Sequence, residues 1–360
     1  MDRKLTRIDF AAIGHQDSWD KIHDFVSSIR KSDLVPLTIE EIKDTYKYIP
    51  PRKIFDVEIS STQKNCKSRG IYIETFISPD ELKVRHFKKC IEKIKQAAEI
   101  AAANHAGVTA LGGFTSIVLE GEMNLLNPGT LYTTGNTLTT AFIIKSIEKA
   151  CEQKQINLKN SSVMILGSTG DIGSALSNYF SHKCQDLLLC ARNELKLKKQ
   201  QKALQPHQAQ SRIVQDPKKD ASHASIIISV ASSTDVISGI KPSIPQIVCD
   251  AGYPKNLGAC EWHKDSLYYY GGMGIVEGGV KFSNKQSSSF YAFPMTNIIH
   301  GCLLEAIVLG FEKRFEAYSY GKGNITLLKI KEILKIAEQH GVTIAPYFNH
   351  KGLCQTKVKQ

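Results

Sequence analysis

Several features that would set this chain apart from ordinary enzymes are missing. No apolar run reaches the roughly 18 residues that a membrane-spanning helix requires. The nine cysteines include no C-x-x-C pair and no metal-site spacing, so they predict reduced thiols in the cytoplasm. The basic start MDRKLTRIDF is followed by too few apolar residues for a signal peptide. Repeats and low-complexity segments are also lacking.

Composition and charge are those of a soluble enzyme with a basic surface. Of the 360 residues, 42% are hydrophobic and 22% are charged, which allows two domains or one domain with an added lobe. The formal net charge is +11, with basic clusters at 83–89 and 196–199. Such a surface attracts an acidic carrier protein or an anionic membrane, and no nucleic-acid-binding module accompanies it. Solvated helix faces without a partner are the alternative.

The most informative segment is SSVMILGSTGDIGSALSN at 161–178. A β-leaning apolar run leads directly into glycines, and a helix-like segment opens behind them. Glycines allow a tight turn that exposes backbone N–H groups, and a helix N-terminus favours a pyrophosphate. The G-x-x-G-x-x-G spacing is one residue off the common dinucleotide fingerprint, so the strand–turn–helix context carries the argument; a plain turn is the alternative. The predicted cofactor-binding residues are Gly167, Ser168, Thr169, Gly170, Asp171, Ile172 and Gly173.

The end of the next predicted strand, 187–190, indicates which nucleotide binds. Ligands of doubly wound sheets lie beyond the carboxyl ends of the strands, where this strand would face the ribose. Arg192 stands there, 25 residues after Gly167, whereas Asp186 stands at the opposite end. A guanidinium pairs with a 2′-phosphate, so Arg192 with its neighbour Asn193 predicts NADPH. A solvated arginine at a loop start is the alternative.

Three regions follow from the distribution of apolar runs. Residues 156–285 alternate short apolar runs with helical stretches, which predicts an α/β fold with a Rossmann-like doubly wound parallel sheet. Residues 1–155 predict an α/β N-terminal substrate lobe. Residues 286–360 predict a helical C-terminal region, with helices near 296–318 and 325–340.

Local signals predict elements within these regions. Residues 57–61 and 71–77 flank a polar turn and predict a hairpin. A helix is expected from an N-cap at Ser78 towards residue 107, and another from 138 to about 153. The tail after residue 341 is expected to be loosely held.

Two Gly- and Thr-rich loops and one strand end are further candidates. Because glycines permit close backbone approach, the loops predict a substrate cleft, with ordinary helix capping as the alternative. Its expected lining residues are Gly112, Gly113, Thr134, Gly135 and Asn136. After the predicted strand SIIISV, Ala231 and Ser232 are expected to approach the nicotinamide.

Several blocks occur together along nearly the whole chain. They are IGH at 13–15, ALGGFTSI at 110–117, TTGNT at 133–137, GSTGDIGSA at 167–175, ARN at 191–193, GYPKNLG at 252–258 and NIT at 324–326. Their order and spacing closely resemble the cyanobacterial-type long-chain acyl-[acyl-carrier-protein] reductases. Members of that family use NADPH to reduce a fatty acyl thioester to a free aldehyde. The resemblance implies this activity here, with acyl carrier protein delivering the acyl group and the N-terminal lobe, 1–155, binding it.

The resemblance also implies a catalytic cysteine. The family nucleophile lies in a helix just before Glu-Ala, and the matching residue is Cys302 in HGCLLEAIVLGFEK, although His300 and Gly301 depart from the family pattern. Its thiolate attacks the thioester to give an acyl-enzyme, which accepts hydride from NADPH and leaves as aldehyde. A buried packing cysteine is the alternative.

The activation of Cys302 is less evident from the sequence. On a helix starting near Thr296, His300 would point to another face, and the helix N-terminus would give only modest help. Glu305 would share the face of Cys302, but a carboxylate raises the pKa of a thiol. Lys255 follows a predicted strand and is expected to stabilise the thiolate or the oxyanion. A surface lysine in a turn is the alternative.

Other functions and partners stay open at this point. A shikimate- or quinate-type NADP dehydrogenase of a small polar ketone would dispense with Cys302 and use a Lys/Asp pair. A non-enzymatic NADP-binding partner protein would bind nucleotide without acyl transfer. Within the reductase interpretation, coenzyme A could carry the acyl group, Mg²⁺ could act as an activator without an evident ligand cluster, and an aldehyde-consuming enzyme could act downstream. Membrane contact is expected to be peripheral at most.

Overall fold

The chain folds into two compact units. The computed structural model describes residues 7–16, 18–31, 33–81, 87–119, 123–232, 237, 239–242, 244–253, 255, 257–258, 260–283, 291, 293–321 and 323–354. Unit 1 is formed by residues 1–138, 274–321 and 333–343, and unit 2 by residues 139–273, 322–332 and 344–360. These boundaries differ from the three expected regions, because the C-terminal part contributes segments to both units. No helix in the described ranges is long and apolar enough to cross a membrane.

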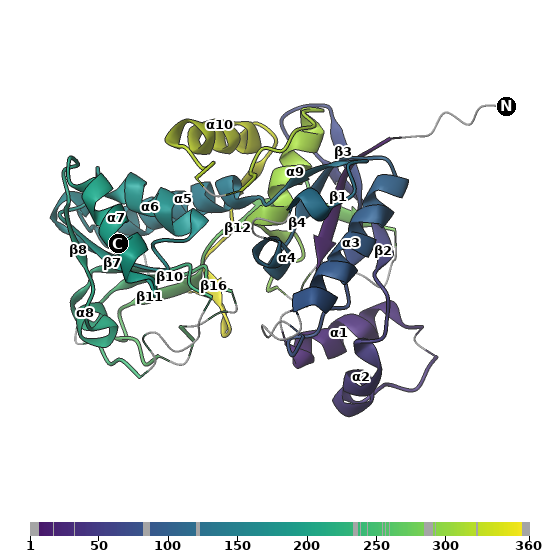
Figure 1. Cartoon of the computed structure of the whole chain (residues 1–360), viewed down its shortest axis with the longest axis horizontal. Coiled ribbons are helices and arrows are strands. Elements are labelled where there is room, and N and C mark those ends of the chain that lie inside the picture. The colour runs from purple at the N-terminus through teal and green to yellow at the C-terminus, as the bar shows by residue number, and fades with distance from the viewer. Residues whose placement is uncertain are drawn as a thin grey trace. The chain divides into compact units, whose positions relative to one another are not determined.

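Unit 1 is built on a six-stranded sheet with the order β13-β2-β3-β1-β4-β5. Figure 1 labels its strands β1 to β4. Four strands are parallel: β1 (Ile8–Gly14), β3 (Lys67–Glu74), β4 (Ala106–Leu111) and β5 (Leu131–Thr133). Two strands form the antiparallel edge: β2 (Arg52–Ser60) and β13 (Val280–Phe282). The expected hairpin is confirmed as β2 and β3.

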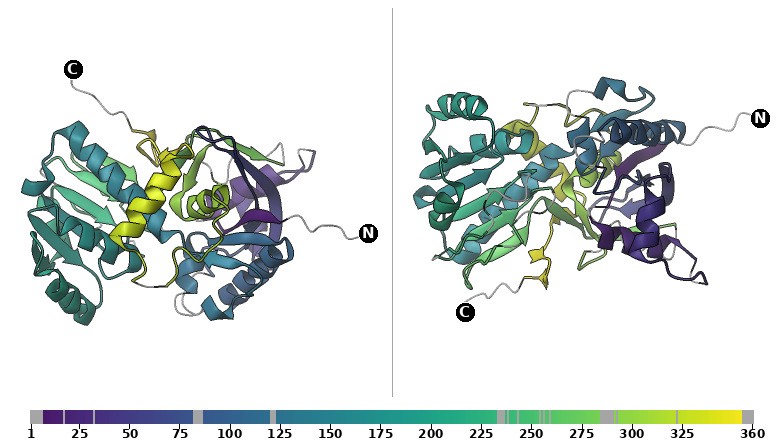
Figure 2. Two further views of the ribbon diagram at one scale, coloured as in Figure 1. Left: turned by 90° about the horizontal axis from the view of Figure 1, so that it is seen from above. Right: turned by 60° about the horizontal axis from the view of Figure 1, so that its bottom comes forward.

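The helices of unit 1 are α1 (Trp19–Ile29), α2 (Ile39–Tyr46), α3 (Phe87–Ala103), α4 (Phe114–Val118), the short 3₁₀ helix η2 (Met123–Leu125) and α9 (Gly301–Phe311). Of these, α3 and α9 pack on the sheet. Apolar residues of α3 such as Ile94 and Ala98 pack with Ile13 and Ile73 of the strands. Helix α9 comes from late in the chain, yet it packs on β1, β3 and β4, where Figure 2 also shows it.

The helix expected from Ser78 towards residue 107 ends earlier than predicted, at Ala103. Ser78 and Glu81 cap one another across a single turn, with Ser78 N–H and Oγ–H donating to the Glu81 carboxylate. Residues 82–86 lie outside the described part of the chain, and α3 is assigned from Phe87. At the other end the expectation is wrong, because residues 106–111 are a fully buried apolar run that forms β4.

Unit 2 holds the predicted doubly wound parallel sheet. Its strands are β6 (Ser162–Leu166), β7 (Asp186–Cys190), β8 (Gln210–Ile213), β9 (Ile226–Ser229), β10 (Ile247–Asp250) and β11 (Leu267–Tyr270). The order β11-β10-β9-β6-β7-β8 reverses between β6 and β9, and all neighbours are parallel. This is the Rossmann-like arrangement, whose ligands bind where the order reverses. The fold class is confirmed.

The helices that belong wholly or partly to unit 2 are α5 (Asn136–Lys154), the 3₁₀ helix η3 (Leu158–Asn160), α6 (Asp171–Phe180), α7 (Glu194–Leu204), α8 (Pro217–His223) and α10 (Leu327–Glu338). Of these, α6, α7 and α8 connect the strands β6 to β9. The expected helix from 138 to about 153 is confirmed as α5. The first residues of α5 and the last of α10 belong to unit 1.

The C-terminal region is less helical than predicted. A small sheet, β14-β12-β15, contains β14 (Ile298–His300), β12 (Met273–Val276) and β15 (Val342–Ile344). The β-branched and buried Ile298 and Ile299 favour a strand where a helix was expected. The expectation that the tail after residue 341 is loosely held is also wrong for residues 342–354. The hairpin of β16 (Phe348–Asn349) and β17 (Gly352–Leu353) follows Tyr347, whose hydroxyl donates to the Ser146 carbonyl at 2.8 Å.

Candidate functional site

The glycine loop after β6 has the geometry of an anion cradle. Gly167 has a φ of 85°, and a Cβ there would lie 2.9 Å from the Val230 carbonyl oxygen. A Cβ on Gly173 would lie 2.1 Å from the Gly167 carbonyl oxygen, so neither glycine can be replaced without rearrangement. Gly170, by contrast, is exposed and would meet only that carbonyl, at 3.3 Å. It precedes α6 without a side-chain cap, which leaves first-turn N–H groups for an anion.

A buried hydroxyl in the same loop supports a polar ligand. The Oγ of Ser168 is enclosed and has no hydrogen-bond partner. Leaving such a group unpaired costs about 1–3 kcal/mol, which a polar ligand at the loop would offset. The Asp171 carboxylate, which could oppose an anion at the start of α6, accepts the Gly323 N–H at 3.2 Å. The residues of this loop therefore fit the pyrophosphate of a dinucleotide.

The other predicted nucleotide residues lie around this loop. Ala231 is adjacent to it, because a Cβ on Gly167 would lie 3.0 Å from the Ala231 backbone nitrogen, and Ser232 follows. Arg192 is exposed two residues beyond β7. Asn193 accepts the Lys196 N–H at 2.9 Å and thereby caps α7, a local role that needs no ligand. Contacts of these residues with a nucleotide stay a prediction.

Lys255 is held within unit 2. Its ammonium group donates to the Asp250 carbonyl at 2.9 Å and lies 5.2 Å from the centre of the Tyr270 ring. Cys302 belongs to unit 1. These contacts explain the position of the Lys255 side chain within unit 2. Its expected role, to stabilise the thiolate of Cys302 or the oxyanion, stays a prediction.

Cys302 is the second residue of α9. The helix begins at Gly301 with His300 as its N-cap, so the expected start near Thr296 is wrong. Residues 298–300 form β14, and the chain turns directly from this strand into the helix. The thiol therefore lies in the first helical turn, where unsatisfied N–H groups carry partial positive charge. Cys302 therefore lies closer to the helix N-terminus than predicted.

Opposing influences act on the ionisation of Cys302. The residue is partly exposed, yet burial of the thiol group is the strongest influence and raises its pKa to about 11. The Glu305 carboxylate raises the pKa further, as expected from the sequence. Hydrogen bonds with the backbone of Gly113, Leu303 and Cys302 itself lower it. At neutral pH the sulfur is thus a thiol with donors already directed at it.

The two glycine loops of unit 1 meet at this helical turn. Gly135 has a φ of 66°, and a Cβ there would lie 2.2 Å from the Cα and 2.2 Å from the carbonyl oxygen of Cys302. A Cβ on Gly112 would lie 2.8 Å from the Leu303 side chain. Thr134 anchors the second loop, since its N–H donates to the Ser319 carbonyl at 2.8 Å and its hydroxyl accepts the Asn136 N–H at 3.4 Å.

These contacts bring Gly112, Gly113 and Gly135 to the first turn of α9, whereas Thr134 and Asn136 shape the loop itself. Substrate contact by any of the five residues stays a prediction.

A buried carboxylate joins the second loop to α9. Glu305 is fully buried and accepts hydrogen bonds from the Leu138 N–H at 3.0 Å, the Ser319 hydroxyl at 2.9 Å and the Thr133 hydroxyl. The predicted influence of Glu305 on Cys302 is confirmed in direction. Its structural role was not expected, because its donors lie about 170 residues away or in a loop.

Similarity to known proteins agrees with this geometry. The chain is 29% identical to the long-chain acyl-[acyl-carrier-protein] reductase of Synechococcus elongatus, over 92% of this chain and 97% of that protein. The predicted resemblance is confirmed. The similarity also bears out an oxidoreductase that uses a nicotinamide cofactor.

Two further comparisons are more distant. The aminotransferase PigE of Serratia sp. is 27% identical over 71% of this chain, which spans only 30% of that protein. The L-tryptophan dehydrogenase of Nostoc punctiforme superposes with a TM-score of 0.35 and 10% identity, over 94% of this chain and 82% of that one. No family model matches the sequence.

The sequence did not predict that His15 lies beside the first glycine loop at Cys302. Its Nε2 accepts the Phe114 N–H at 2.9 Å, and a Cβ on Gly113 would lie 3.0 Å from the same nitrogen. Nδ1, 3.2 Å from the Gln16 carbonyl, then carries the proton of a neutral imidazole. The IGH block draws attention to His15, but nothing in the sequence connects it to residues 113–114.

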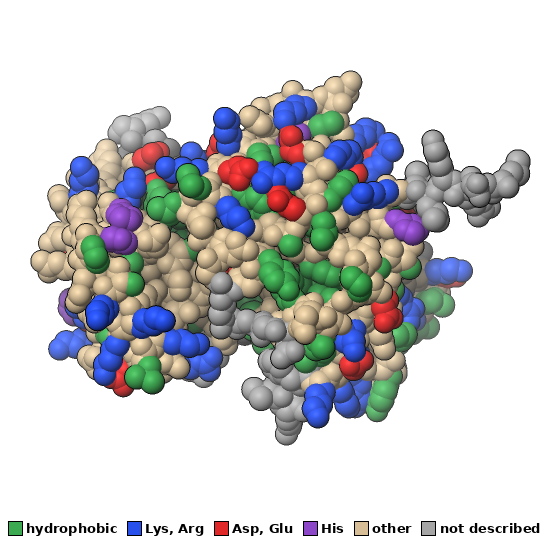
Figure 3. Space-filling model, turned by 45° about the horizontal axis from the view of Figure 1, so that its top comes forward, with side chains coloured by type: hydrophobic (Ala, Val, Ile, Leu, Met, Phe, Trp, Pro, Cys, Tyr) green, Lys and Arg blue, Asp and Glu red, His purple; other side chains and the backbone are tan. Residues whose placement is uncertain are grey.

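Two expectations concern exposed basic residues and a metal site. Figure 3 shows Lys and Arg side chains spread over one face of the molecule. On α7, Lys196, Lys198 and Lys199 are exposed; of the cluster at 83–89, Lys88 and Lys89 are exposed and residues 83–86 lie outside the described ranges. Within the ranges that the structure describes, no group of three or more His, Cys, Asp or Glu residues could hold a metal ion. Activation by Mg²⁺ stays a prediction.

Proposed function

We propose that this chain is an NADPH-dependent reductase that converts a long-chain fatty acyl thioester on acyl carrier protein into a fatty aldehyde, through an acyl thioester on Cys302. The observation that carries the proposal is the position of Cys302, second in α9 and enclosed by both glycine loops. Similarity to a long-chain acyl-[acyl-carrier-protein] reductase along nearly the whole chain supports the same substrate class.

The surroundings of Cys302 suit a nucleophile that attacks a thioester. Loss of the thiol proton gives a thiolate, which bonds to the acyl carbon while the thiol of the carrier leaves. N–H groups of the first helical turn and of Gly113 already face the sulfur, and such donors can also stabilise the oxyanion of the tetrahedral adduct. With a pKa of about 11, the thiolate fraction rises with pH, so acylation should accelerate as pH increases.

Unit 2 would hold the nucleotide. The loop 167–173 and the N-terminus of α6 would bind the pyrophosphate, and Arg192 would bind the 2′-phosphate that distinguishes NADPH from NADH. Residues 230–232 lie next to that loop and would border the nicotinamide. When bound, NADPH supplies the hydride that reduces the acyl thioester.

Replacing Arg192 with alanine tests the choice of nucleotide. The loss of a charge-assisted contact should raise the Kd for NADPH about 10- to 100-fold and leave the Kd for NADH nearly unchanged. Fluorescence titration with both nucleotides measures the two constants. Lys196→Ala removes another exposed cation near the start of α7 and should leave both constants unchanged. Equal weakening of both nucleotides in Arg192→Ala would contradict the assignment.

The acyl-enzyme is tested by intact-protein mass spectrometry. Stearoyl-acyl carrier protein is mixed with the protein in the absence of NADPH. We expect a mass gain of one acyl group on the wild type and none on Cys302→Ala, and discharge of the adduct as aldehyde when NADPH is added. Cys66→Ala, which removes another partly exposed cysteine, should behave like the wild type.

The opposite result would change the proposed function. A wild-type protein that binds NADPH but gains no acyl group would favour the dehydrogenase of a small polar ketone or the non-enzymatic nucleotide-binding protein. A comparison of stearoyl-acyl carrier protein with stearoyl-coenzyme A in the same experiment identifies the preferred carrier. The net charge of +11 favours the acidic carrier protein.

Partners and surroundings follow from this chemistry. A free aldehyde is reactive, which favours a downstream enzyme that consumes it. The long acyl chain and the basic surface are compatible with peripheral contact to an anionic membrane. A cytoplasmic location and stimulation by Mg²⁺ belong to the same proposal and are tested by fractionation and by assays with a chelator.

A further inference from the structure

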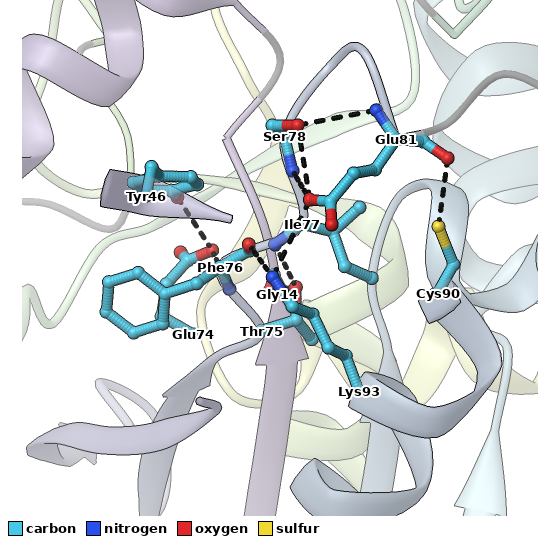
Figure 4. Close-up of polar contacts among 10 residues, drawn as sticks. All are labelled: Gly14, Tyr46, Glu74, Thr75, Phe76, Ile77, Ser78, Glu81, Cys90 and Lys93. Atoms are coloured by element: carbon cyan, nitrogen blue, oxygen red, sulfur yellow. Dashed lines mark hydrogen bonds and ion pairs between the residues drawn. The ribbon is translucent and has the colours of Figure 1, made fainter. Parts of the chain in front are cut away.

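The carboxyl end of β3 carries a buried acidic side chain that the proposed reaction does not use. Glu74 is 0% exposed, and four donors face its two carboxylate oxygens. They are Tyr72 Oη at 2.8 Å, Gln16 Nε2 at 3.2 Å, Phe76 N at 3.3 Å and Tyr46 Oη at 3.5 Å. Figure 4 shows the Tyr46 hydroxyl directed at this carboxylate. Because all four groups can donate, the arrangement suits an ionised carboxylate.

A series of hydrogen bonds leads from this carboxylate to the thiol of Cys302. The links are, in order, Gln16 Nε2 to Glu74 at 3.2 Å, His15 Nδ1 to the Gln16 carbonyl at 3.2 Å, Phe114 N to His15 Nε2 at 2.9 Å, and the backbone of Gly113 to the Cys302 sulfur. Every member of the series belongs to unit 1.

The topology of the sheet explains why these residues meet. Strands β1, β3 and β4 are parallel, and their carboxyl ends lie at one edge, with Gly14 opposite Glu74 and Ile13 opposite Leu111. The first turn of α9 lies at the same edge, because a Cβ on Gly112 would touch both Leu303 and the Ile13 carbonyl. Ligand-binding residues commonly gather at such an edge.

Other titratable groups surround Glu74 without neutralising it. Lys93 of α3 donates to the Phe76 carbonyl and pairs with Glu81 at 3.6 Å, as Figure 4 shows. The Arg52 guanidinium of β2 lies 5.5 Å from the centre of the Phe76 ring. Besides Tyr46 and Tyr72, the Tyr291 hydroxyl is near, since a Cβ on Gly14 would lie 2.7 Å from Tyr72 Oη and 3.0 Å from Tyr291 Oη. Within the described ranges, no cation is hydrogen-bonded to Glu74.

We propose that Glu74 is a positioning residue for the chemistry at Cys302. Its carboxylate holds the Gln16 side chain, and the Gln16 carbonyl orients His15. His15 in turn holds the loop whose Gly113 backbone is hydrogen-bonded to the Cys302 sulfur. Protonation of Glu74 weakens this series of contacts and thereby reduces the reactivity of the thiol. The catalytic meaning of this inference rests on the proposed function, in which Cys302 is the nucleophile.

Titration of Glu74 is expected near neutral pH. Burial raises the pKa of Glu74 to about 7, and the hydrogen bonds from Tyr72, Gln16, Phe76 and Tyr46 oppose that rise. Protonation removes the charge that strengthens all four hydrogen bonds, and the new carboxyl O–H finds an acceptor only if the Tyr46 or Tyr72 hydroxyl turns round and stops donating. The contact between Gly113 and the thiol should therefore be firm above pH 7 and weaker below it.

Alkylation of Cys302 by iodoacetamide tests this inference without any substrate. Peptide mass spectrometry measures the rate of alkylation from about pH 6 to about pH 9. Over this range the ionisation of the thiol by itself raises the rate about tenfold per pH unit. The wild type should show an additional inflection near pH 7. Glu74→Gln should remove the inflection and lower the rate above pH 7 about tenfold. If the acyl adduct of the proposed function fails to form, alkylation still judges this inference by itself.

A matched control uses the neighbouring buried carboxylate. Glu81 is 9% exposed and bonds to Ser78 and Lys93, but it has no link to His15. Glu81→Gln should keep the inflection. The inference is overturned if Glu74→Gln gives a profile of wild-type shape, or if Glu81→Gln also removes the inflection.

A second variant keeps the test decisive if Glu74→Gln does not fold. Gln16→Met retains the length of the side chain and the backbone carbonyl that accepts from His15, but it removes one donor from Glu74. Residue 16 then no longer contacts Glu74, so protonation of the carboxylate cannot reach His15 and the inflection near pH 7 should disappear. An inflection that persists would overturn the proposal.

Discussion

Replacing Gly135 with alanine should abolish acylation of Cys302 and destabilise the protein by about 2–6 kcal/mol. The added Cβ would lie 2.2 Å from both the Cα and the carbonyl oxygen of Cys302, and these are backbone atoms that cannot rotate away. The φ of 66° adds strain for any residue with a side chain. The loop and the first turn of α9 must therefore separate, which displaces the thiol.

Urea unfolding and the acyl-adduct experiment measure the two effects of Gly135→Ala. Gly321 offers a matched control, because its φ of 68° is similar and no atom lies within 4 Å of the position of a Cβ. Gly321→Ala should cost about 1–2 kcal/mol, the strain alone, and should leave the adduct intact. If Gly135→Ala and Gly321→Ala lost the same stability and both formed the acyl adduct, the close approach of Gly135 to the Cys302 backbone would be refuted.

Truncating Glu305 to alanine should cost about 3–5 kcal/mol of unfolding free energy. The carboxylate is fully buried and accepts from the Leu138 N–H, the Ser319 hydroxyl and the Thr133 hydroxyl. The hydroxyls have other partners, since Thr137 Oγ lies 2.6 Å from Ser319 Oγ and the Ser319 N–H lies 3.1 Å from Thr133 Oγ. The backbone N–H would be left unpaired beside a new cavity. Urea unfolding gives the loss, and a change below about 1 kcal/mol would contradict this role.

Glu305→Gln separates packing from electrostatics. Glutamine keeps the size and one acceptor oxygen but removes the charge that raises the pKa of Cys302. The thiolate fraction at a given pH should then increase, so Cys302 should be alkylated faster even though the fold is less stable. Slower alkylation of folded protein would show that the carboxylate acts mainly by holding the loop.

Much of unit 2 was predictable because its central strands carry a simple signal. Strands buried on both faces of a parallel sheet are continuous apolar runs, as 226–229 and 247–250 are. The glycines at 167 and 173 mark places where no Cβ fits. Strand β8 was missed because its side chains alternate between exposed and half-buried at the edge of the sheet.

The surroundings of Cys302 were less predictable, for tertiary reasons. The start of α9 has no side-chain cap that a sequence pattern could indicate. At Ser78 a clear capping pattern is present, but residues 82–86, which follow its first turn, lie outside the described ranges. The contact of His15 with Phe114 spans 99 residues, and that of Gln16 with Glu74 spans 58. Only the parallel arrangement of β1, β3 and β4 brings those residues together.

The origin of α9 late in the chain has a consequence for synthesis on the ribosome. Strands β1 to β5 are all made before residue 134, whereas the helix that packs on three of them ends at residue 311. For nearly half the length of the chain, the surface that α9 will cover is therefore without its partner and available to chaperones or to other nascent chains. The nucleotide-binding sheet, 162–270, is complete before α9 emerges. The thiol thus comes into place only after most of both sheets has been synthesised.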